Sequence, residues 1–286
     1  MIGGILMKAL IKKMRELAGM SQEQFAKELS TTPVSINRWE NGKTNPNLMA
    51  QNQLLEFCKK NNIDIADVII EKYKYIVDNR LVLYHGSKQG IKGDIVPISR
   101  PDCDFGSGFY MGTEILQPLT LICGEEKPVF YVVDFSLDDL KVLDVELGLE
   151  WAMVIAYHRG YLDIIKGTAM YEKYSHYLDG YDVVVGYIAD DRLYTELNRF
   201  FNGDITDEVL MRCLSALELG KQYVALTEKA CKNVKILKEN EIPNLELALL
   251  MEKSKIRRLE GNSLAKEIEK KYRRIGKYFD EILRGE

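Results

Sequence analysis

Apolar residues in the first quarter of the chain recur three and four positions apart, without alternating runs, as far as about Lys74. That spacing predicts five short helices. From Leu81 onward, short β-like runs are separated by glycine turns and helical stretches, which predicts an α+β domain. We expect strands at residues 81–84, 129–133, 181–185 and 222–226, and helices at residues 146–159, 190–201 and 206–217.

The chain after about Lys238 is rich in charge and is expected to be helical, with Pro243 and Gly261-Asn262 as its breaks. Six apolar residues there form a single stripe at helical spacing: Leu264, Ile268, Tyr272, Ile275, Phe279 and Ile282. A helix of this kind has to bury its apolar face. We expect it to pack on the central domain, with a dimer or a separate protein partner as alternatives. These patterns divide the chain into residues 1–76, 80–238 and 239–286.

Composition supports packed globular domains, because 46% of the 286 residues are hydrophobic. No stretch approaches the roughly 20 apolar residues that span a bilayer, and the first residues lack a signal-peptide cleavage site. We therefore expect a cytosolic protein that does not bind membranes. The five cysteines form no Cys-x-x-Cys pair and the three histidines do not cluster, so neither a disulfide framework nor a metal site is expected.

The net charge of −4 is distributed unevenly. Residues 1–74 carry 11 basic and 8 acidic residues, net +3, and residues 239–286 are net +1, which leaves the middle of the chain at net −8. An acidic middle is a poor surface for nucleic acid, whereas the first segment can approach phosphate without repulsion.

The amino-terminal segment contains two helix starts at close spacing. Ser21 can cap a first helix, with Gln24 returning the bond to complete a capping box. Thr32 can cap a second helix with Pro33 at its first position, where a missing N–H costs nothing. About three residues, 30–32, join the two helices, which is the length that a helix-turn-helix uses.

Within this unit, packing and exposure can be assigned from the helical period. Ala26 is small enough for close helix approach, and Val34, Ile36 and Trp39 can supply the packing. The exposed side of the second helix is then left with Ser35, Asn37 and Arg38, and Lys43 lies beyond its end.

The stretch from Ser21 to Lys43 resembles the Cro/C1 repressor family of bacterial and phage regulators, and the likeness extends over about residues 7–72. The resemblance implies DNA as a partner, with Gln22 and Lys43 on phosphates and with Ser35, Asn37 and Arg38 in the major groove. Because the second helix carries few basic residues, tight binding would require a homodimer. The alternative is a helix-turn-helix kept only for dimerisation or docking.

Three further elements carry candidate chemistry. His85 and Gly86 end a predicted strand, which places an imidazole beside an open backbone. The segment 105–110 then offers two glycines, which allow close backbone approach to a ligand, followed by two aromatic residues. Gln222 opens a late strand, on which alternate residues share one face.

In this order, His-Gly-Ser at 85–87, Gly-x-Gly-Phe-Tyr at 106–110 and a polar residue at 222 resemble ADP-ribosyltransferases of the diphtheria-toxin and poly-ADP-ribose polymerase type. The match covers roughly residues 80–237 and is nearest to a poorly characterised bacterial family. It implies an ADP-ribosyltransferase-like fold and NAD as substrate. By position, the resemblance gives each residue a role: His85 holds a nicotinamide-ribose hydroxyl, Gly86 pairs with the amide, Tyr110 stacks on the nicotinamide ring, and Ser87 and Gly108 line the NAD site.

The sequence departs from the more active members of that group at Gln222, where they have a glutamate. An amide can accept a ribose hydroxyl but lacks charge, a deficit on the order of 2–4 kcal/mol in transition-state stabilisation. This fits single transfer, slow turnover or none, and it predicts that Gln222→Glu raises nicotinamide release. If the alignment is shifted, Glu218 or Glu228 is the third residue.

Each of these residues also has a structural interpretation. His85 can be a satisfied strand-end group, the two glycines an ordinary hairpin, and Tyr110 a core aromatic. The acidic pair Asp190-Asp191 suggests paired carboxylates for metal or acid–base chemistry, although Asp190 is better interpreted as the cap of the following helix.

Taken together, the sequence predicts a bacterial or phage protein that joins a DNA-binding domain to an NAD-dependent mono-ADP-ribosyltransferase-like domain, in a toxin–antitoxin or phage-defence setting. The ADP-ribose acceptor is left open. The alternative is a transcriptional regulator whose central domain senses NAD or a related nucleotide without chemistry, and an interaction scaffold is the third possibility.

Overall fold

The computed structural model describes residues 2–64, 66–188, 194–216 and 220–285. Its amino-terminal region is helical, as expected, with five helices among the described residues: α1 (Ile2–Leu17), α2 (Gln22–Glu28), α3 (Pro33–Glu40), α4 (Leu48–Lys60) and α5 (Ala66–Tyr73). Both predicted helix starts are confirmed. Ser21 and Gln24 form the capping box of α2, and the Thr32 hydroxyl accepts the Ser35 N–H ahead of Pro33.

The core of this helical region differs from the expected one at one residue. Ile36 and Trp39 are buried as predicted, next to an edge-to-face contact between Phe25 and Phe57 with ring centroids 4.9 Å apart. Val34, expected to pack, is instead 61% exposed. It lies in the first turn of α3, two residues after the Thr32 cap.

A mixed seven-stranded sheet forms the centre of the second region, in the order β4-β5-β6-β2-β1-β3-β7. Only the β4–β5 pair is parallel, and the other neighbours are antiparallel. The strands are β1 (Val82–Ser87), β2 (Phe109–Gly112), β3 (Val129–Phe135), β4 (Val142–Asp144), β5 (Val183–Tyr187), β6 (Lys221–Ala225) and β7 (Val234–Glu241). The four expected strands are present, and His85 and Gly86 lie at the end of β1, as predicted.

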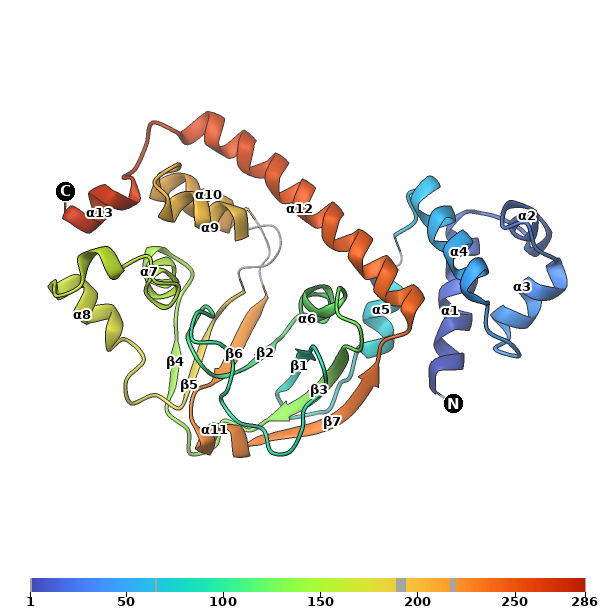
Figure 1. Cartoon of the computed structure of the whole chain (residues 1–286), viewed down its shortest axis with the longest axis horizontal. Helices are drawn as coiled ribbons and strands as arrows, with labels where there is room; N and C mark the ends of the chain where they lie inside the picture. Colours follow the sequence, from blue (N-terminus) through green and yellow to red (C-terminus); the bar gives the residue numbers. More distant parts are fainter. Residues whose placement is uncertain (1, 65, 189–193, 217–219, 286) are drawn as a thin grey trace.

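Helices cover the two faces of the sheet unequally (Figure 1). The other elements are α6 (Leu116–Ile122), α7 (Leu149–His158), the short 3-10 helix at Asp163–Ile165, α8 (Ala169–Ser175), α9 (Tyr194–Phe201), α10 (Asp207–Ser215), α11 (Glu228–Lys232), α12 (Asn244–Tyr272) and α13 (Phe279–Arg284). One face packs on α6 near β1 and β3, and on α7, α9 and α10 near β5 and β6. The short α11 covers the opposite face.

The chain after Lys238 departs from the expected helix in two places. Residues 234–241 form the edge strand β7, which carries two lysines and two glutamates. These charges mask the apolar pattern of a strand and keep the edge soluble. The helix α12 then passes through Gly261-Asn262 without a break, and Gly261 is buried in it. Pro243 does mark the start of α12, as predicted.

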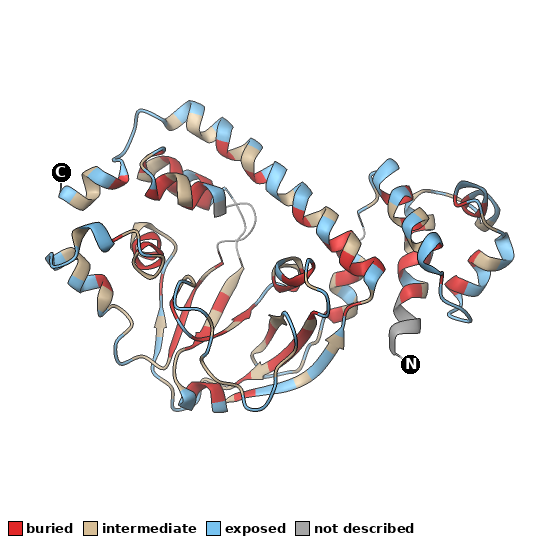
Figure 2. Cartoon of the chain, viewed as in Figure 1, coloured by how far each residue is buried: buried red, intermediate tan, exposed pale blue. Residues whose placement is uncertain are grey.

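The predicted apolar stripe is divided between two helices. Ala265 and Phe279 are buried against the α7–α10 core, with Ile268, Tyr272 and Ile282 packed beside them, so packing on the central domain is confirmed. The stripe is not continuous, because α12 ends at Tyr272 and Ile275 in the connection is 52% exposed. Buried positions on α12 gather at its start, near α4 and α6 (Figure 2).

The helical region and the sheet share one apolar core. Tyr73 of α5 packs its ring 4.7 Å from that of Phe130 on β3, centroid to centroid. Beside this contact, Lys72 Nζ lies 2.8 Å from a Glu246 carboxylate oxygen at the start of α12, and Glu246 is fully buried. The first region is therefore docked on the second through α5, α6 and α12.

Candidate functional site

A cavity of about 590 Å³ opens on the sheet between α6 and the α7–α9 side. Its size is that of an ordinary small-molecule site. It brings together four of the residues that the sequence singled out, His85, Gly86, Tyr110 and Gln222, with two charged residues that sequence reasoning missed, Asp104 and Arg159.

His85 reaches this cavity from β1, and its surroundings fix its chemical form. Its Nδ1 lies 2.7 Å from the carbonyl oxygen of Tyr110, and its ring stacks 4.3 Å from that of Phe109. A carbonyl only accepts hydrogen bonds, so Nδ1 carries the hydrogen and Nε2 is left as an acceptor. Burial lowers the pKa of His85, which keeps the ring neutral at pH 7.

Tyr110 uses its hydroxyl within the protein. The oxygen accepts the Phe105 N–H at 2.9 Å and donates to the Gly106 carbonyl at 2.8 Å. Burial, with a smaller contribution from the charge of Asp104, raises the pKa of Tyr110. Tyr110 thus holds Phe105 and Gly106 in place beside the cavity that it also lines. Its stacking on a ligand stays a prediction.

Two glycines near the cavity have no room for a side chain, each because of a different neighbour. A Cβ on Gly86 would lie 2.7 Å from the Pro118 carbonyl oxygen, so α6 packs directly on this point of β1. A Cβ on Gly108 would lie 2.4 Å from Val224 Cγ1, which means that close β2–β6 pairing requires this glycine. Gly108 and Ser87 are not among the lining residues, so two of the predicted NAD-site positions lie outside the cavity.

Gln222 stands at the head of β6 with only 7% of its surface exposed. Its Nε2 donates to the Tyr187 carbonyl oxygen at 3.0 Å and to Asp104 Oδ2 at 3.2 Å. Of the alternatives for the third position, Glu228 is exposed on α11, away from the cavity lining, and Glu218 lies outside the described residues. Asp190 and Asp191 also lie outside them.

Asp104 and Arg159 form an ion pair with 2.6 Å between Oδ1 and Nη2, and each side chain is less than one-fifth exposed. Asp104 precedes the glycine turn before β2, whereas Arg159 directly follows α7. Their separation of 55 residues explains why no local motif connects them. A carboxylate, an amide, a neutral imidazole and a tyrosine therefore meet at one cavity.

His158 lies against the turn that contains Gly106. It should make the free energy of unfolding depend on pH. Burial lowers its pKa to about 4 from an ordinary value of 6.5. As pH falls from 6.5 towards 4, the unfolded chain binds a proton here that the folded chain does not, so the free energy of unfolding decreases. Urea unfolding at pH 7 and pH 4.5 should show a pH-induced loss smaller by about 1–2 kcal/mol in His158→Gln than in the wild type.

The control for that measurement is His176→Gln, because the His176 side chain is 68% exposed and its ion-pair partners Asp179 and Glu172 are exposed as well. This variant should keep the wild-type pH dependence. An identical pH dependence in His158→Gln and the wild type would contradict the prediction.

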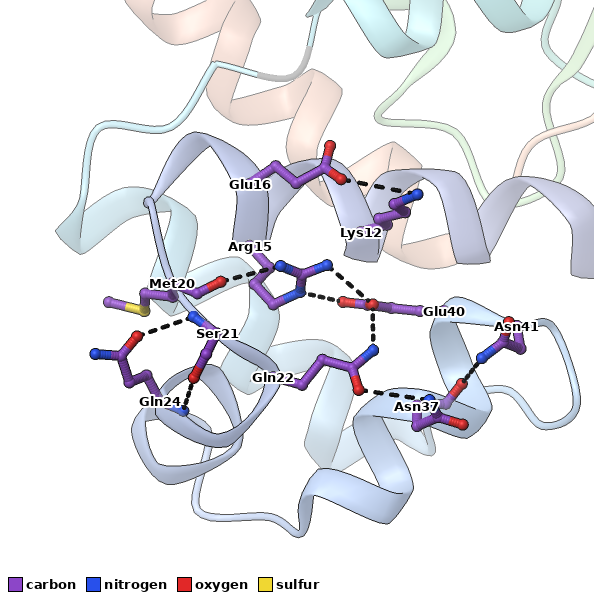
Figure 3. A network of polar contacts seen from close by, with 10 residues as sticks. All are labelled: Lys12, Arg15, Glu16, Met20, Ser21, Gln22, Gln24, Asn37, Glu40 and Asn41. Atoms are coloured by element: carbon purple, nitrogen blue, oxygen red, sulfur yellow. Dashed lines mark hydrogen bonds and ion pairs between the residues drawn. The ribbon is translucent and has the colours of Figure 1, made fainter.

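The second candidate surface is the outer side of α2 and α3. Asn37 and Arg38 are exposed on α3, and Lys43 is exposed beyond the helix, in agreement with the sequence. Ser35, predicted on the same exposed side, is half-buried, with its hydroxyl bonded to that of Thr32. Gln22 is held rather than free. Its Nε2 donates to Glu40 at 2.7 Å, and its Oε1 accepts from Asn37 at 3.4 Å (Figure 3).

Beneath this surface lies a buried ion pair. Arg15 of α1 donates to both Glu40 carboxylate oxygens, at 2.7 and 3.2 Å, and also to the Met20 carbonyl (Figure 3). The hydrogen bond to the Glu40 carboxylate raises the pKa of Arg15. Glu40 thus connects α1, α2 and α3, and it orients the Gln22 and Asn37 side chains at the surface.

Two structural features bear on binding partners. Within the described ranges, no group of three or more His, Cys, Asp or Glu side chains is arranged to hold a metal ion. No described helix is both long and apolar enough to cross a membrane. The five cysteines are all free thiols, four buried and Cys103 half-buried.

Comparisons with known proteins match two parts of the chain separately. A helix-turn-helix family model matches residues 11–58, which supports DNA as a partner of the amino-terminal region. No curated protein and no solved structure matches the chain. The model of a family of proteins of unknown function, DUF3990, matches residues 81–236, the region of the sheet and the cavity. Since that match spans more than half of the 286 residues, the chain belongs to the DUF3990 family.

Proposed function

We propose that the cavity binds NAD and that the protein transfers its ADP-ribose to an acceptor, in a polypeptide that also binds DNA. The observation that carries this proposal is the meeting of His85, Gly86, Tyr110 and Gln222, from three different strands, at one cavity. The resemblance to ADP-ribosyltransferases assigns the NAD site to the same residues from their order along the chain. A toxin–antitoxin or phage-defence role belongs to the same proposal.

The residues fit the chemistry that such a substrate needs. The bare Nε2 of His85 and the Oε1 of Gln222 can each accept a ribose hydroxyl, and the backbone of Gly86 can pair with a carboxamide. In the transfer, the bond between the nicotinamide nitrogen and ribose C1′ breaks, and nicotinamide leaves with the electron pair. The acceptor nucleophile then bonds to C1′ and loses its proton. The transition state is cationic at the sugar, as in glycoside hydrolysis.

Nicotinamide release tests this function directly. Full-length protein is incubated with NAD labelled on the adenylate, and free nicotinamide and labelled macromolecules are followed together. We expect His85→Ala to lower nicotinamide release about 100-fold or more, because it removes a contact to the reacting ribose. His176→Ala replaces an exposed histidine that does not line the cavity; it is the matched control and should keep the wild-type rate. Wild-type protein that neither binds nor cleaves NAD would refute the proposal.

DNA binding has its own test. The affinity for a duplex should fall steeply with salt, because phosphate contacts release counterions. Replacing both exposed residues, Asn37→Ala with Arg38→Ala, should weaken binding by about 1–3 kcal/mol for the major-groove contact and reduce the salt dependence. The matched control is Lys27→Ala on the exposed side of α2, outside the predicted contacts. An affinity that changes with neither salt nor the double substitution would exclude the predicted DNA-binding face.

A second function, NAD sensing by a regulator, is favoured by the position of α6. Gln117, Pro118 and Leu121 of this helix line the cavity, while Leu119 and Ile122 lie in the core shared with α5 and α12. A ligand that shifts α6 would therefore act on the docking of the helix-turn-helix region. For a sensor, DNA affinity should change with NAD concentration while nicotinamide is not released.

A further inference from the structure

The amide of Gln222 has a single orientation compatible with its neighbours. Its Nε2 donates to two acceptors, the Tyr187 carbonyl oxygen and Asp104 Oδ2. Rotating the amide by half a turn would place Oε1 against a carbonyl and a carboxylate, which repel it. Both hydrogens of Nε2 are used, so Oε1 is the atom left to accept a bond from a molecule in the cavity.

Asp104 is itself firmly held. Its other oxygen accepts the Arg159 guanidinium at 2.6 Å, and its side chain is 16% exposed. The following residue, Phe105, donates its N–H to the Tyr110 hydroxyl, and this hydrogen bond fixes the turn. Asp104 therefore presents Oδ2 to Gln222 from a rigid position.

We propose that Asp104 is the positioning residue for Gln222, and that this site is built for a carboxylate–amide pair in which position 222 carries the amide and position 104 the charge. The inference rests on the proposed function and deepens it, because Gln222 then serves as an oriented hydroxyl acceptor for the ribose. On this proposal, glutamine at position 222 is the functional residue of this site and not the loss of a catalytic glutamate.

This proposal reverses one expectation from the sequence, which predicts that Gln222→Glu raises nicotinamide release by restoring a charge. In the structure, the new carboxylate would face Asp104 across a gap that measures 3.2 Å in the wild type, and it would also face the Tyr187 carbonyl. Two carboxylates at that distance cannot both ionise freely, so one pKa rises. The substitution alone should lose function and stability.

The test is a double-mutant cycle on the full-length chain: Asp104→Asn, Gln222→Glu and the exchanged pair Asp104→Asn with Gln222→Glu. For nicotinamide release from NAD, we expect each single variant to lose roughly 100-fold in kcat with little change in KM. The exchanged pair should recover at least tenfold of that loss, because the new asparagine amide can donate to the new glutamate carboxylate. Asp94→Asn, an exposed residue of the same connection outside the cavity, is the control and should keep wild-type kinetics.

Thermal melting supplies a readout that needs no activity. Gln222→Glu should have a lower Tm at pH 7 than at pH 4.5, relative to wild type, because its raised carboxyl pKa costs stability once pH exceeds the ordinary value. Adding Asp104→Asn should reduce that pH dependence, because it removes the facing carboxylate while the Tyr187 carbonyl stays in place. If wild-type protein leaves NAD intact, the proposed function fails and the melts alone decide whether the pair is coupled. If wild-type protein cleaves NAD but Asp104→Asn does so at the wild-type rate, or if the melts show no coupling, the inference is overturned.

Discussion

Glu40→Ala is expected to lower the free energy of unfolding of the helix-turn-helix region by about 3–5 kcal/mol, because it leaves the Arg15 guanidinium buried without its counterion. The two side chains, of Arg15 and Glu40, are 16% and 5% exposed. The same substitution removes the acceptor that holds Gln22, so DNA affinity should fall even under conditions where the region stays folded. Urea unfolding and duplex binding are the measurements.

Tryptophan fluorescence can assign that loss to the correct region. The chain has two tryptophans, Trp39 beside Glu40 and the buried Trp151 of α7. In a Trp151→Phe background, fluorescence therefore reports on Trp39 alone. The matched control is Glu28→Ala, whose partner Lys60 is 72% exposed, and a change below about 1 kcal/mol is expected. If the two substitutions lower the free energy of unfolding equally, the Arg15–Glu40 pair stabilises the region no more than the exposed Glu28–Lys60 pair does.

The elements that sequence predicted best are those specified by local signals. The caps at Ser21 and Thr32, the helical period before Lys74 and four apolar strands all depend on residues within a few positions of one another. The strand β7 escaped prediction because it is an edge strand, in which Val234 is buried while lysines and glutamates occupy most of the other positions. The continuity of α12 across Gly261 was not predicted either. Glycine locally disfavours a helix, but packing holds the helix together at this position.

The cavity shows the same limit. His85, Gly86 and Tyr110 were found through their order along the chain, and the structure brings them together. Asp104 and Arg159 could not be found, because what makes them partners is the folding of the β1–β2 connection onto the end of α7. Gln222 was identified, but its orientation depends on two groups 35 and 118 residues away. Sequence order thus identified four residues that line one cavity, while the charges beside them depend on tertiary structure.

The interface between the two regions also contains a buried ion pair, Lys72–Glu246. No local sequence pattern indicates it. Glu246 is fully buried, and its Oε2 pairs with Lys72 across 174 residues of sequence. Lys72 also bonds to the Tyr73 hydroxyl at 2.6 Å, and its side chain is 13% exposed. Burial lowers the pKa of Lys72, because desolvation disfavours the charged ammonium. Such a pair holds α5 on α12 only while both charges are present.

Lys72→Met should therefore destabilise the protein by about 3–5 kcal/mol at pH 7, because it leaves the Glu246 carboxylate buried and unpaired. Combining Lys72→Met with Glu246→Leu should restore most of the stability, since two apolar side chains of similar volume replace the pair. Lys253→Met is the matched control: it breaks an ion pair at the same interface whose carboxylate, Asp64, is 59% exposed, and it should cost less than about 1 kcal/mol. If Lys72→Met and Lys253→Met prove equally mild, the docking of the helix-turn-helix region depends on the apolar contact of Tyr73 with Phe130 and not on the buried charges.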